Sequence, residues 1–421
     1  MMKHTNPRRE FASPFVAPPV ASRSYAQSSF DTGSLAVRDT ASPAGSTSQR
    51  RRPAFRILAA CALVVAGCSS GATPREAAVN AAAAEAFANQ LRLNAQAEIL
   101  VDSIDELCAT PKHLDGNVAG AATDAIVAMR HTWSYTAAMQ IDSVTERRSW
   151  AVIDWPISTD DITSLLLDES KDLTPERIGK RSGADQRGLG AAEHLLALHL
   201  ADEQPPPPSA GTAQRRCEYL SSVGEVMLEE SELILGDAWL IVDGDEPLFK
   251  LIAPDAEMGV DRLVNEAIFL LEAMTDMELG RALGETSAET RLDAVVEGPL
   301  GLGAADMGAH LDGLRAVLLG TDHAISIATE AGMIFDFDES SGFRLLLDDD
   351  LVSRLTDQFH DAQTTLEQVE GPLRDAVVND SATVSRARAA LKALQITIST
   401  EVVAQLGVTI GFSDADGDSS A

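Results

Sequence analysis

Long amphipathic runs with recognisable helix ends recur between residues 74 and 406 of this 421-residue chain. The first run opens at a capping box, Thr73-Pro74-Arg75-Glu76, which places proline at the first helical position. In the run 348–370 the apolar residues follow one another in alternating steps of four and three, and Gly371-Pro372 ends it. No segment shows a convincing period-two alternation that would indicate a strand. The pattern predicts an all-α protein, and the low aromatic content of 5% agrees with helices over strands.

The helical runs fall into two groups separated by one irregular stretch, 241–257, which contains Asp243-Gly244-Asp245 and two prolines. Two bundles of about four helices each are therefore expected, an N-terminal one over 74–240 and a C-terminal one over 258–412. The expected helices cover 74–108, 116–140, 186–201, 213–239, 259–280, 304–320, 348–370 and 381–406.

A basic and then apolar segment precedes the first bundle. Arg50-Arg51-Arg52 is followed by an apolar run at 57–67, and the run closes on Val65-Ala66-Gly67-Cys68. Such a run is too short for a stable membrane span and is typical of a secretory signal. Its ending resembles the lipobox of bacterial lipoproteins, which implies that residues 1–67 are removed, that Cys68 is lipidated and that 68–73 forms a tether. The alternative is a short buried helix that contains a cysteine.

Charge limits the partners of the expected mature chain. Residues 1–67 hold nine of the 33 basic and three of the 64 acidic residues, so the remainder has a net charge of −37. A field of that sign repels nucleic acid and anionic headgroups and attracts cations or basic partners. A merely solubilising acidic surface explains the same composition.

Two cysteines, Cys108 and Cys217, remain in the predicted bundles. In an oxidising periplasm they can pair, which would tie the helix 213–239 to the end of the helix 74–108. Two independent buried thiols are the alternative.

An acidic residue interrupts an apolar helix face in the segment 186–201. Leu189, Glu193, Leu196 and Leu200 share one face, so Glu193 needs a cation, a hydrogen-bond donor or a raised pKa. It is predicted either to be a structural carboxylate paired with an arginine between helices or to belong to a binding site. Its candidate neighbours are Asp154, Arg130 and the aspartates at 414–418.

The same segment resembles the GxHxxE signature of the imelysin family of bacterial envelope proteins. Gly188 and Glu193 match the ends of the signature, and Gly190 stands where the histidine would be. The resemblance extends over nearly the whole mature chain through Cys108 with Pro111, Trp133 with Tyr135, Ile153-Asp154-Trp155-Pro156, Arg216 to Leu220, Leu279-Gly280 with Leu283-Gly284, and Leu406 to Asp418.

The resemblance implies a lipid-anchored protein of two helical domains, with a site that includes Gly188, Gly190, Glu193, Asp154 and Trp155. Some members of the family are linked to iron acquisition. We therefore expect a non-catalytic protein at the periplasmic face of the outer membrane that binds a ligand or an envelope protein, with iron as the metal to consider. A metallopeptidase of the same family and a structural or adaptor lipoprotein are the alternatives.

Metal ligands are sparse in the sequence. A catalytic zinc ion needs three protein ligands, and neither HExxH nor HxxEH is present, because position 190 is glycine. Glu193 and His194 remain as weak candidates, while His194 and His199 point about 140° apart on one helix. The run Asp414-Ala415-Asp416-Gly417-Asp418 has glycine at the fourth position instead of the sixth of a calcium loop. An acidic tail, 413–421, explains that run more simply.

Overall fold

Helices account for almost all of the described secondary structure. The computed structural model describes residues 64–65, 72–109, 116–200, 212–244, 246–286, 290–320, 334–335 and 342–411, all within one compact unit that begins at Ala59. A two-residue parallel pairing of β1 (Val64–Val65) with β2 (Ile334–Phe335) is the one strand pairing among these residues. The expected all-α class is confirmed. Cys68 and the acidic tail 413–421 lie outside the described residues.

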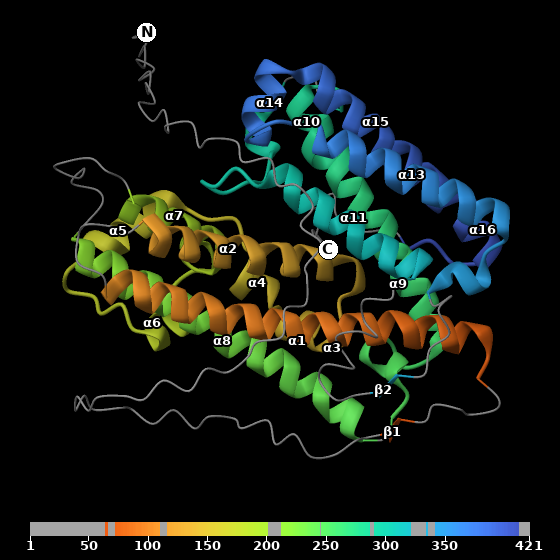
Figure 1. Ribbon diagram of the computed structural model, residues 1–421, viewed down its shortest axis with the longest axis horizontal. Coiled ribbons are helices and arrows are strands. Elements are labelled where there is room, and N and C mark those ends of the chain that lie inside the picture. The colour runs from red at the N-terminus through yellow and green to blue at the C-terminus, as the bar shows by residue number, and fades with distance from the viewer. Residues whose placement is uncertain are drawn as a thin grey trace, which may run out of the picture. The chain divides into compact units, whose positions relative to one another are not determined.

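Three long helices, α1, α2 and α8, form the framework of the N-terminal half (Figure 1). Helix α1 packs along both of the others, and α7 packs on α8. The described helices of this half are α1 (Pro74–Ala109), α2 (Gly116–Thr136), η1 (Ala137–Met139), α3 (Asp142–Arg147), α4 (Trp150–Ile153), α5 (Thr159–Leu167), α6 (Pro175–Arg181), η2 (Ala184–Gln186), α7 (Gly188–Leu200) and α8 (Ala213–Asp243).

In the C-terminal half α11 packs on α13, and α13 packs on α15. Two segments here, η5 and η8, are π-helical and continue α9 and α15 without a break. The described helices of this half are η4 (Leu248–Leu251), α9 (Ala256–Glu272), η5 (Ala273–Gly280), α10 (Arg281–Leu283), η6 (Leu292–Ala294), α11 (Gly303–Leu319), η7 (Phe343–Leu346), α13 (Asp349–Glu367), α14 (Leu373–Asn379), α15 (Ser381–Thr397), η8 (Ile398–Val402) and α16 (Val403–Leu406).

The two halves meet through α1 and through the pair α2 and α11. The first turns of α1 contact η4 and α9, and Asn80 accepts a hydrogen bond of 2.8 Å from the amide of Phe249. Helix α11 crosses the end of α2 so closely that a Cβ atom at Gly313 would lie 2.1 Å from the carbonyl oxygen of Tyr135. The buried apolar side chains form one continuous cluster through both halves. The division at 241–257 stays a prediction.

Cys108 and Cys217 form the expected disulfide, with their Cα atoms 5.6 Å apart. The bond joins the last turn of α1 to the first turns of α8 and closes a loop of 109 residues. Because this loop contains α2 to α7, the bond holds together the ends of the elements that carry Arg130, Asp154 and Glu193, three residues of the site described below.

The region 140–186 is more helical than its sequence pattern indicates. It contains α3 to α6, each of which is too short to show an amphipathic repeat. Their ends are nevertheless marked, since the side chains of Ser158 and Thr174 accept hydrogen bonds from the third residues of α5 and α6. Short capped helices of this kind are set by their caps and by packing rather than by periodicity.

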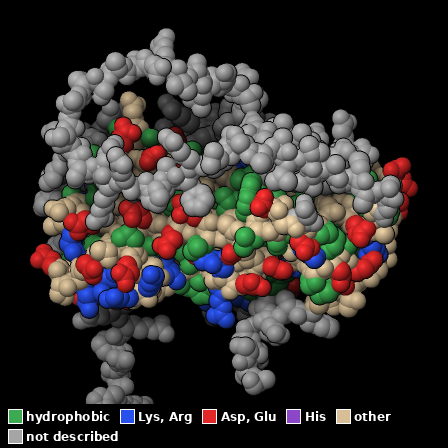
Figure 2. Space-filling model, turned by 90° about the horizontal axis from the view of Figure 1, so that it is seen from below, with side chains coloured by type: hydrophobic (Ala, Val, Ile, Leu, Met, Phe, Trp, Pro, Cys, Tyr) green, Lys and Arg blue, Asp and Glu red, His purple; other side chains and the backbone are tan. Residues whose placement is uncertain are grey.

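Acidic side chains do not form one continuous patch on the visible part of one face of the molecule (Figure 2). On the face seen in Figure 2, Asp and Glu side chains are scattered among hydrophobic and basic ones. None of the helices in the described ranges is both long and apolar enough to cross a membrane.

Candidate functional site

One buried arginine is the centre of the candidate site. Arg130, on the inner face of α2, has a side chain that is 6% exposed. Its Nε donates to Oε1 of Glu193 at 2.5 Å, and its Nη1 lies 3.3 Å from Oδ1 of Asp154 and 3.3 Å from Oδ2 of Asp306. Three carboxylates, from α7, from the residue after α4 and from α11, therefore share one guanidinium group. We call these four residues the Arg130 centre.

Glu193 is the innermost member of the centre. It is completely buried, as its position on the apolar face of α7 predicts. Its Oε2 accepts a hydrogen bond of 3.3 Å from the amide of Leu300, in the segment between η6 and α11. Both carboxylate oxygens are thus engaged, one by a cation and one by the backbone of the C-terminal half. The sequence left two interpretations of Glu193, a structural ion pair with an arginine and a residue of a binding site. Both remain compatible with the structure, because the buried ion pair also forms the core of a polar cluster.

Asp154 and Asp306 form the outer edge of the centre. Their side chains are 29% and 15% exposed, and both accept from the same Nη1 atom of Arg130. Asp154 also lies 3.5 Å from Nη1 through its second oxygen. Oxygen lone pairs on this edge are not used up by the arginine, so the edge can accept further donors or a cation.

The charges of the centre do not balance, and the pKa values reflect this. Burial raises the pKa of Glu193, an effect opposed by Arg130 and the hydrogen bond from Leu300. The pKa of Asp306 is raised to about 7, because burial and the negative charges of Asp154 and Glu193 together outweigh the lowering effect of Arg130. The nearby carboxylates outweigh burial at Arg130 and raise its pKa. Near neutral pH, Asp306 is therefore partly protonated.

Glycines bring the backbone against the centre. A Cβ atom at Gly298 would lie 2.0 Å from Oε2 of Glu193, so the chain can pass over this carboxylate only with glycine there. Gly188, at the start of α7, has φ +82° and lies so close to the carbonyl of Ile153 that a Cβ atom would be 2.5 Å from its oxygen. These contacts fix α7 against α4 and against the segment before α11.

Position 190, where the GxHxxE signature has histidine, has no room for a side chain. A Cβ atom on Gly190 would lie 2.9 Å from Cγ2 of Ile157. The space that a side chain at 190 would enter is therefore filled by an apolar residue. Glu193, the acidic residue of the signature, pairs with Arg130. Gly190 stands in place of the histidine of the signature and packs against Ile157.

The other predicted site residues lie at the periphery. Trp155 is 41% exposed and packs on Trp150, with ring centroids 5.1 Å apart. Burial lowers the pKa of His194, whose Nε2 has no hydrogen-bond partner among the described residues. Within the described residues neither side chain forms a hydrogen bond or ion pair with Arg130. The aspartates 414–418 lie outside the described residues.

Metal-ligating side chains form no preformed metal-binding group in the described part of the chain, and this includes the Arg130 centre. No group of three or more His, Cys, Asp or Glu with the geometry to hold a metal ion occurs within it. The residues best able to contact a cation are Asp154 and Asp306, because both are partly open to solvent and both present carboxylate oxygens.

Two contributors to the centre were not predicted. Asp306 lies in the first turn of α11, where an acidic residue is ordinarily explained by the helix dipole. The contact of Leu300 is made by its backbone amide, so the residue type at position 300 gives no indication of it. The one sequence signal in this segment is Gly298, within Glu297-Gly298-Pro299. A glycine there is consistent with a backbone that passes close to another group.

The fold and the Arg130 centre together define a class of helical proteins, in which two halves pack together and a buried ion cluster joins α2, α7 and α11. The sequence model described as Imelysin matches residues 86–400. The chain belongs to the imelysin family. No curated protein sequence matches it significantly.

Two solved structures are similar in fold. One is an imelysin-like protein from Psychrobacter arcticum, and the other, from Parabacteroides distasonis, is named as an iron-regulated protein A precursor. Each superposes with a TM-score of 0.60 at 17% sequence identity, over 80% of this chain and 97% of the other. At this identity the likeness establishes the shared fold.

Proposed function

We propose that this protein is a non-catalytic binding protein of the bacterial cell envelope, anchored by lipid on Cys68, and that the Arg130 centre is its ligand site. The observation that carries the proposal is the altered motif. Glu193 is paired with Arg130 at 2.5 Å, and Ile157 fills the space beside Gly190. A hydrolytic metal centre needs three protein ligands and an open position, and this segment offers one carboxylate that is already engaged.

The chemistry of the outer edge points to a cationic ligand. Asp154 and Asp306 are partly exposed, and the centre holds three carboxylates against one arginine. Hard cations prefer carboxylate oxygens, so a di- or trivalent metal ion is the ligand we propose, and iron is the first to test. Support for iron comes from the name of the similar protein from Parabacteroides distasonis, an iron-regulated protein A precursor.

Anchoring is proposed from the segment that ends at Cys68. A lipid anchor on this residue would place α1, which begins at Pro74, within a few residues of the membrane surface. The residue after it is Ser69, which agrees with sorting to the outer membrane, and the net negative charge of the chain argues against nucleic acid as a partner. We expect Cys68→Ala to abolish lipidation and to release the protein from the membrane fraction. Mass spectrometry that finds an unmodified mature N-terminus in the wild type would contradict the anchor.

Binding by the outer edge is tested with Asp154→Asn. The variant keeps the shape of the side chain and leaves Glu193 and Asp306 on the arginine. We expect iron or manganese affinity, measured by titration calorimetry, to fall about tenfold or more while thermal melting changes little, because a charged ligand oxygen contributes more than a neutral one. The matched control is Asp160→Asn on the exposed first turn of α5. Equal metal affinity in wild type, variant and control would exclude the centre as a metal site.

A hydrolysis assay on the same purified protein distinguishes the metallopeptidase alternative from the binding proposal. Its prediction is hydrolysis of a denatured protein substrate that stops with a chelator and with Glu193→Gln. The binding proposal predicts no such hydrolysis at any metal concentration. If hydrolysis is found and is lost in Glu193→Gln, the proposed non-catalytic role is wrong.

A further inference from the structure

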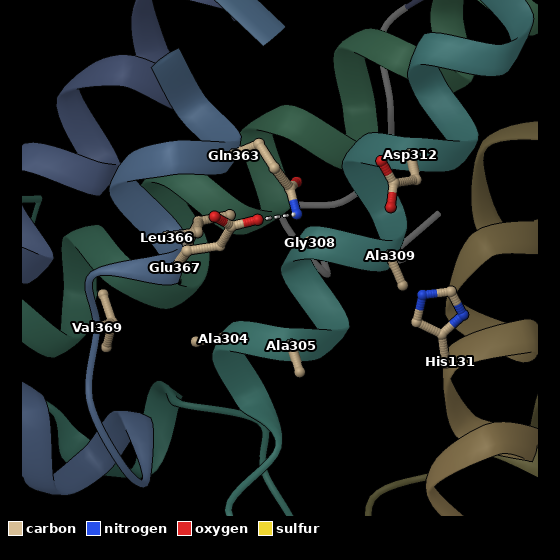
Figure 3. A pocket seen from close by; sticks show the side chains of 10 residues that line it. All are labelled: His131, Ala304, Ala305, Gly308, Ala309, Asp312, Gln363, Leu366, Glu367 and Val369. Carbon is tan, nitrogen blue, oxygen red and sulfur yellow. Dashed lines mark hydrogen bonds between the residues drawn. The ribbon is translucent and has the colours of Figure 1, made fainter. Parts of the chain in front are cut away.

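A second concave site lies between the two halves, on the other side of α11 from the Arg130 centre. A cavity of about 330 Å³ is bounded by α11, by α13 and by His131 of α2 (Figure 3). Its apolar lining is built of small and aliphatic residues, Ala304, Ala305, Gly308, Ala309, Leu366 and Val369. A volume of this size lies at the lower end of the range found for small-molecule sites. Residues 304, 305, 308 and 312 follow one face of the helix, whereas Asp306 points toward Arg130.

The polar part of the lining consists mainly of hydrogen-bond acceptors. Asp312 makes no hydrogen bond or ion pair within the described residues, although His131, which also lines the cavity, and then Arg315 are near enough to lower its pKa. Oε1 of Gln363 is buried and accepts no hydrogen bond there. Glu367 accepts one weak hydrogen bond of 3.4 Å, from Nε2 of Gln363 (Figure 3). No lysine or arginine lines the cavity.

Of these acceptors only Oε1 of Gln363 is buried without a partner, while Asp312 is half-buried and Glu367 is exposed. A buried acceptor without a donor is costly, and its position indicates what is missing. Burial and the like charge of Glu367 both raise the pKa of Asp312, so a cation placed between these carboxylates would relieve a repulsion. Of the common small polar groups, an ammonium offers three donors and no acceptor. The apolar lining fits a short hydrocarbon chain attached to it.

We propose that this cavity is a binding site for a small organic cation, an ammonium group that carries a short alkyl body. The ammonium lies between Asp312, Glu367 and the amide oxygen of Gln363, and the alkyl body lies on Ala304, Ala305 and Leu366. The site is separate from the Arg130 centre and does not depend on the function proposed for it.

The proposal is tested by titration calorimetry of the purified protein with n-pentylammonium chloride and with 1-hexanol, a neutral molecule of similar length. We expect the cation to bind at least about tenfold more tightly than the alcohol, the difference expected of one charge-assisted hydrogen bond. The double variant Asp312→Asn with Glu367→Gln is expected to lose that preference. Asp361→Asn, on the exposed side of α13 outside the cavity, is the matched control and should keep it.

A second variant separates the cavity from the charge. Ala305 is exposed at the mouth of the cavity, so Ala305→Leu should fold normally and reduce binding of both probes by filling the space. Equal binding of cation and alcohol, or undiminished cation binding in the double variant, would overturn the proposal. So would undiminished binding in Ala305→Leu with unchanged thermal melting. Absence of any binding by the wild type would overturn it as well.

Discussion

Two arginines of this protein each pair with more than one carboxylate, but one is deeply buried and the other lies near the surface. Arg130 is buried between α2, α7 and α11 and faces three carboxylates. Arg388, on α15, has a side chain that is 16% exposed and contacts Asp276 and Glu285, and Lys392 shares Asp276 with it. The second network therefore matches two cations with two anions at the surface.

The difference lies in how each network deals with charge. Water and counterions screen the network of Arg388, so an imbalance there would cost little. The Arg130 centre cannot use water in this way, and its excess negative charge is reduced by raising the pKa of Glu193 and Asp306. A buried cluster with more carboxylates than cations is an expensive arrangement for stability alone. This cost is the reason to consider the centre a site and the network of Arg388 a structural contact.

The largest expected effect is that of Arg130→Met. The substitution keeps much of the side-chain volume but leaves the fully buried Glu193 with only the amide of Leu300. We expect a loss of about 3–5 kcal/mol in the free energy of unfolding, because a buried charge is stranded. The matched variant Arg388→Met should lose about 1 kcal/mol. Urea unfolding of both measures the difference, and equal losses would remove the distinction between the two networks.

Gly298→Ala is expected to have the next largest effect. The new methyl group would lie 2.0 Å from Oε2 of Glu193, and that oxygen is held by the rest of the centre. Displacing the carboxylate or the segment 295–300 should cost about 1–3 kcal/mol. The control is Gly236→Ala in the last third of α8, where no atom lies within 4 Å of the new methyl group. That change should instead stabilise by about 0.5–1 kcal/mol. A Gly298→Ala variant as stable as the wild type would mean that the segment is not pressed against the centre.

The pH dependence of stability follows from Asp306. Its pKa in the folded protein is raised from the ordinary value to about 7, so the folded state holds a proton that the unfolded state has already lost. Stability is thus highest while Asp306 is protonated and decreases as the pH rises toward and through about 7. Burial raises the pKa of Glu278 to about 8, which extends the decrease to higher pH. Melting temperatures from pH 5.5 to 8.5 should fall, and less steeply in Asp306→Asn. An unchanged slope in that variant would show that Asp306 does not titrate in this range.

The parts of this molecule that sequence patterns predict are those that a single helix encodes. The amphipathic spacing of 348–370 appears as α13, and the acidic residue on the apolar face of α7 is buried as expected. Cys108 and Cys217 were predicted to pair from their number and the expected compartment, and they do. In each case the evidence is carried by residues at fixed spacing, or by a residue type that must find a partner.

The parts that could not be predicted depend on contacts between elements distant in the chain. Asp306 is 176 residues from Arg130, and its position in a first helical turn has an ordinary explanation. The amide of Leu300 donates to Glu193 whatever the side chain at 300 is. Ile157 fills the space beside Gly190 through the packing of the segment before α5, which no local pattern specifies. The sequence therefore indicates that Glu193 needs a partner, while its partners, Arg130 and the amide of Leu300, are determined by the tertiary fold.

The smallest expected effect is that of Lys392→Met, and its dependence on salt gives the sharpest comparison. Lys392 is 36% exposed and contacts only Asp276 among the described residues, which keeps Arg388 in the variant. We expect a loss of about 0–1 kcal/mol at low salt. The loss should vanish in 1 M sodium chloride, where the Debye length is about 3 Å. Salt screens the fully buried Glu193 poorly, so most of the loss caused by Arg130→Met should persist in the same buffer. If both losses disappeared with salt, the Arg130 centre would be as open to solvent as the surface network, and its raised pKa values would have no cause in burial.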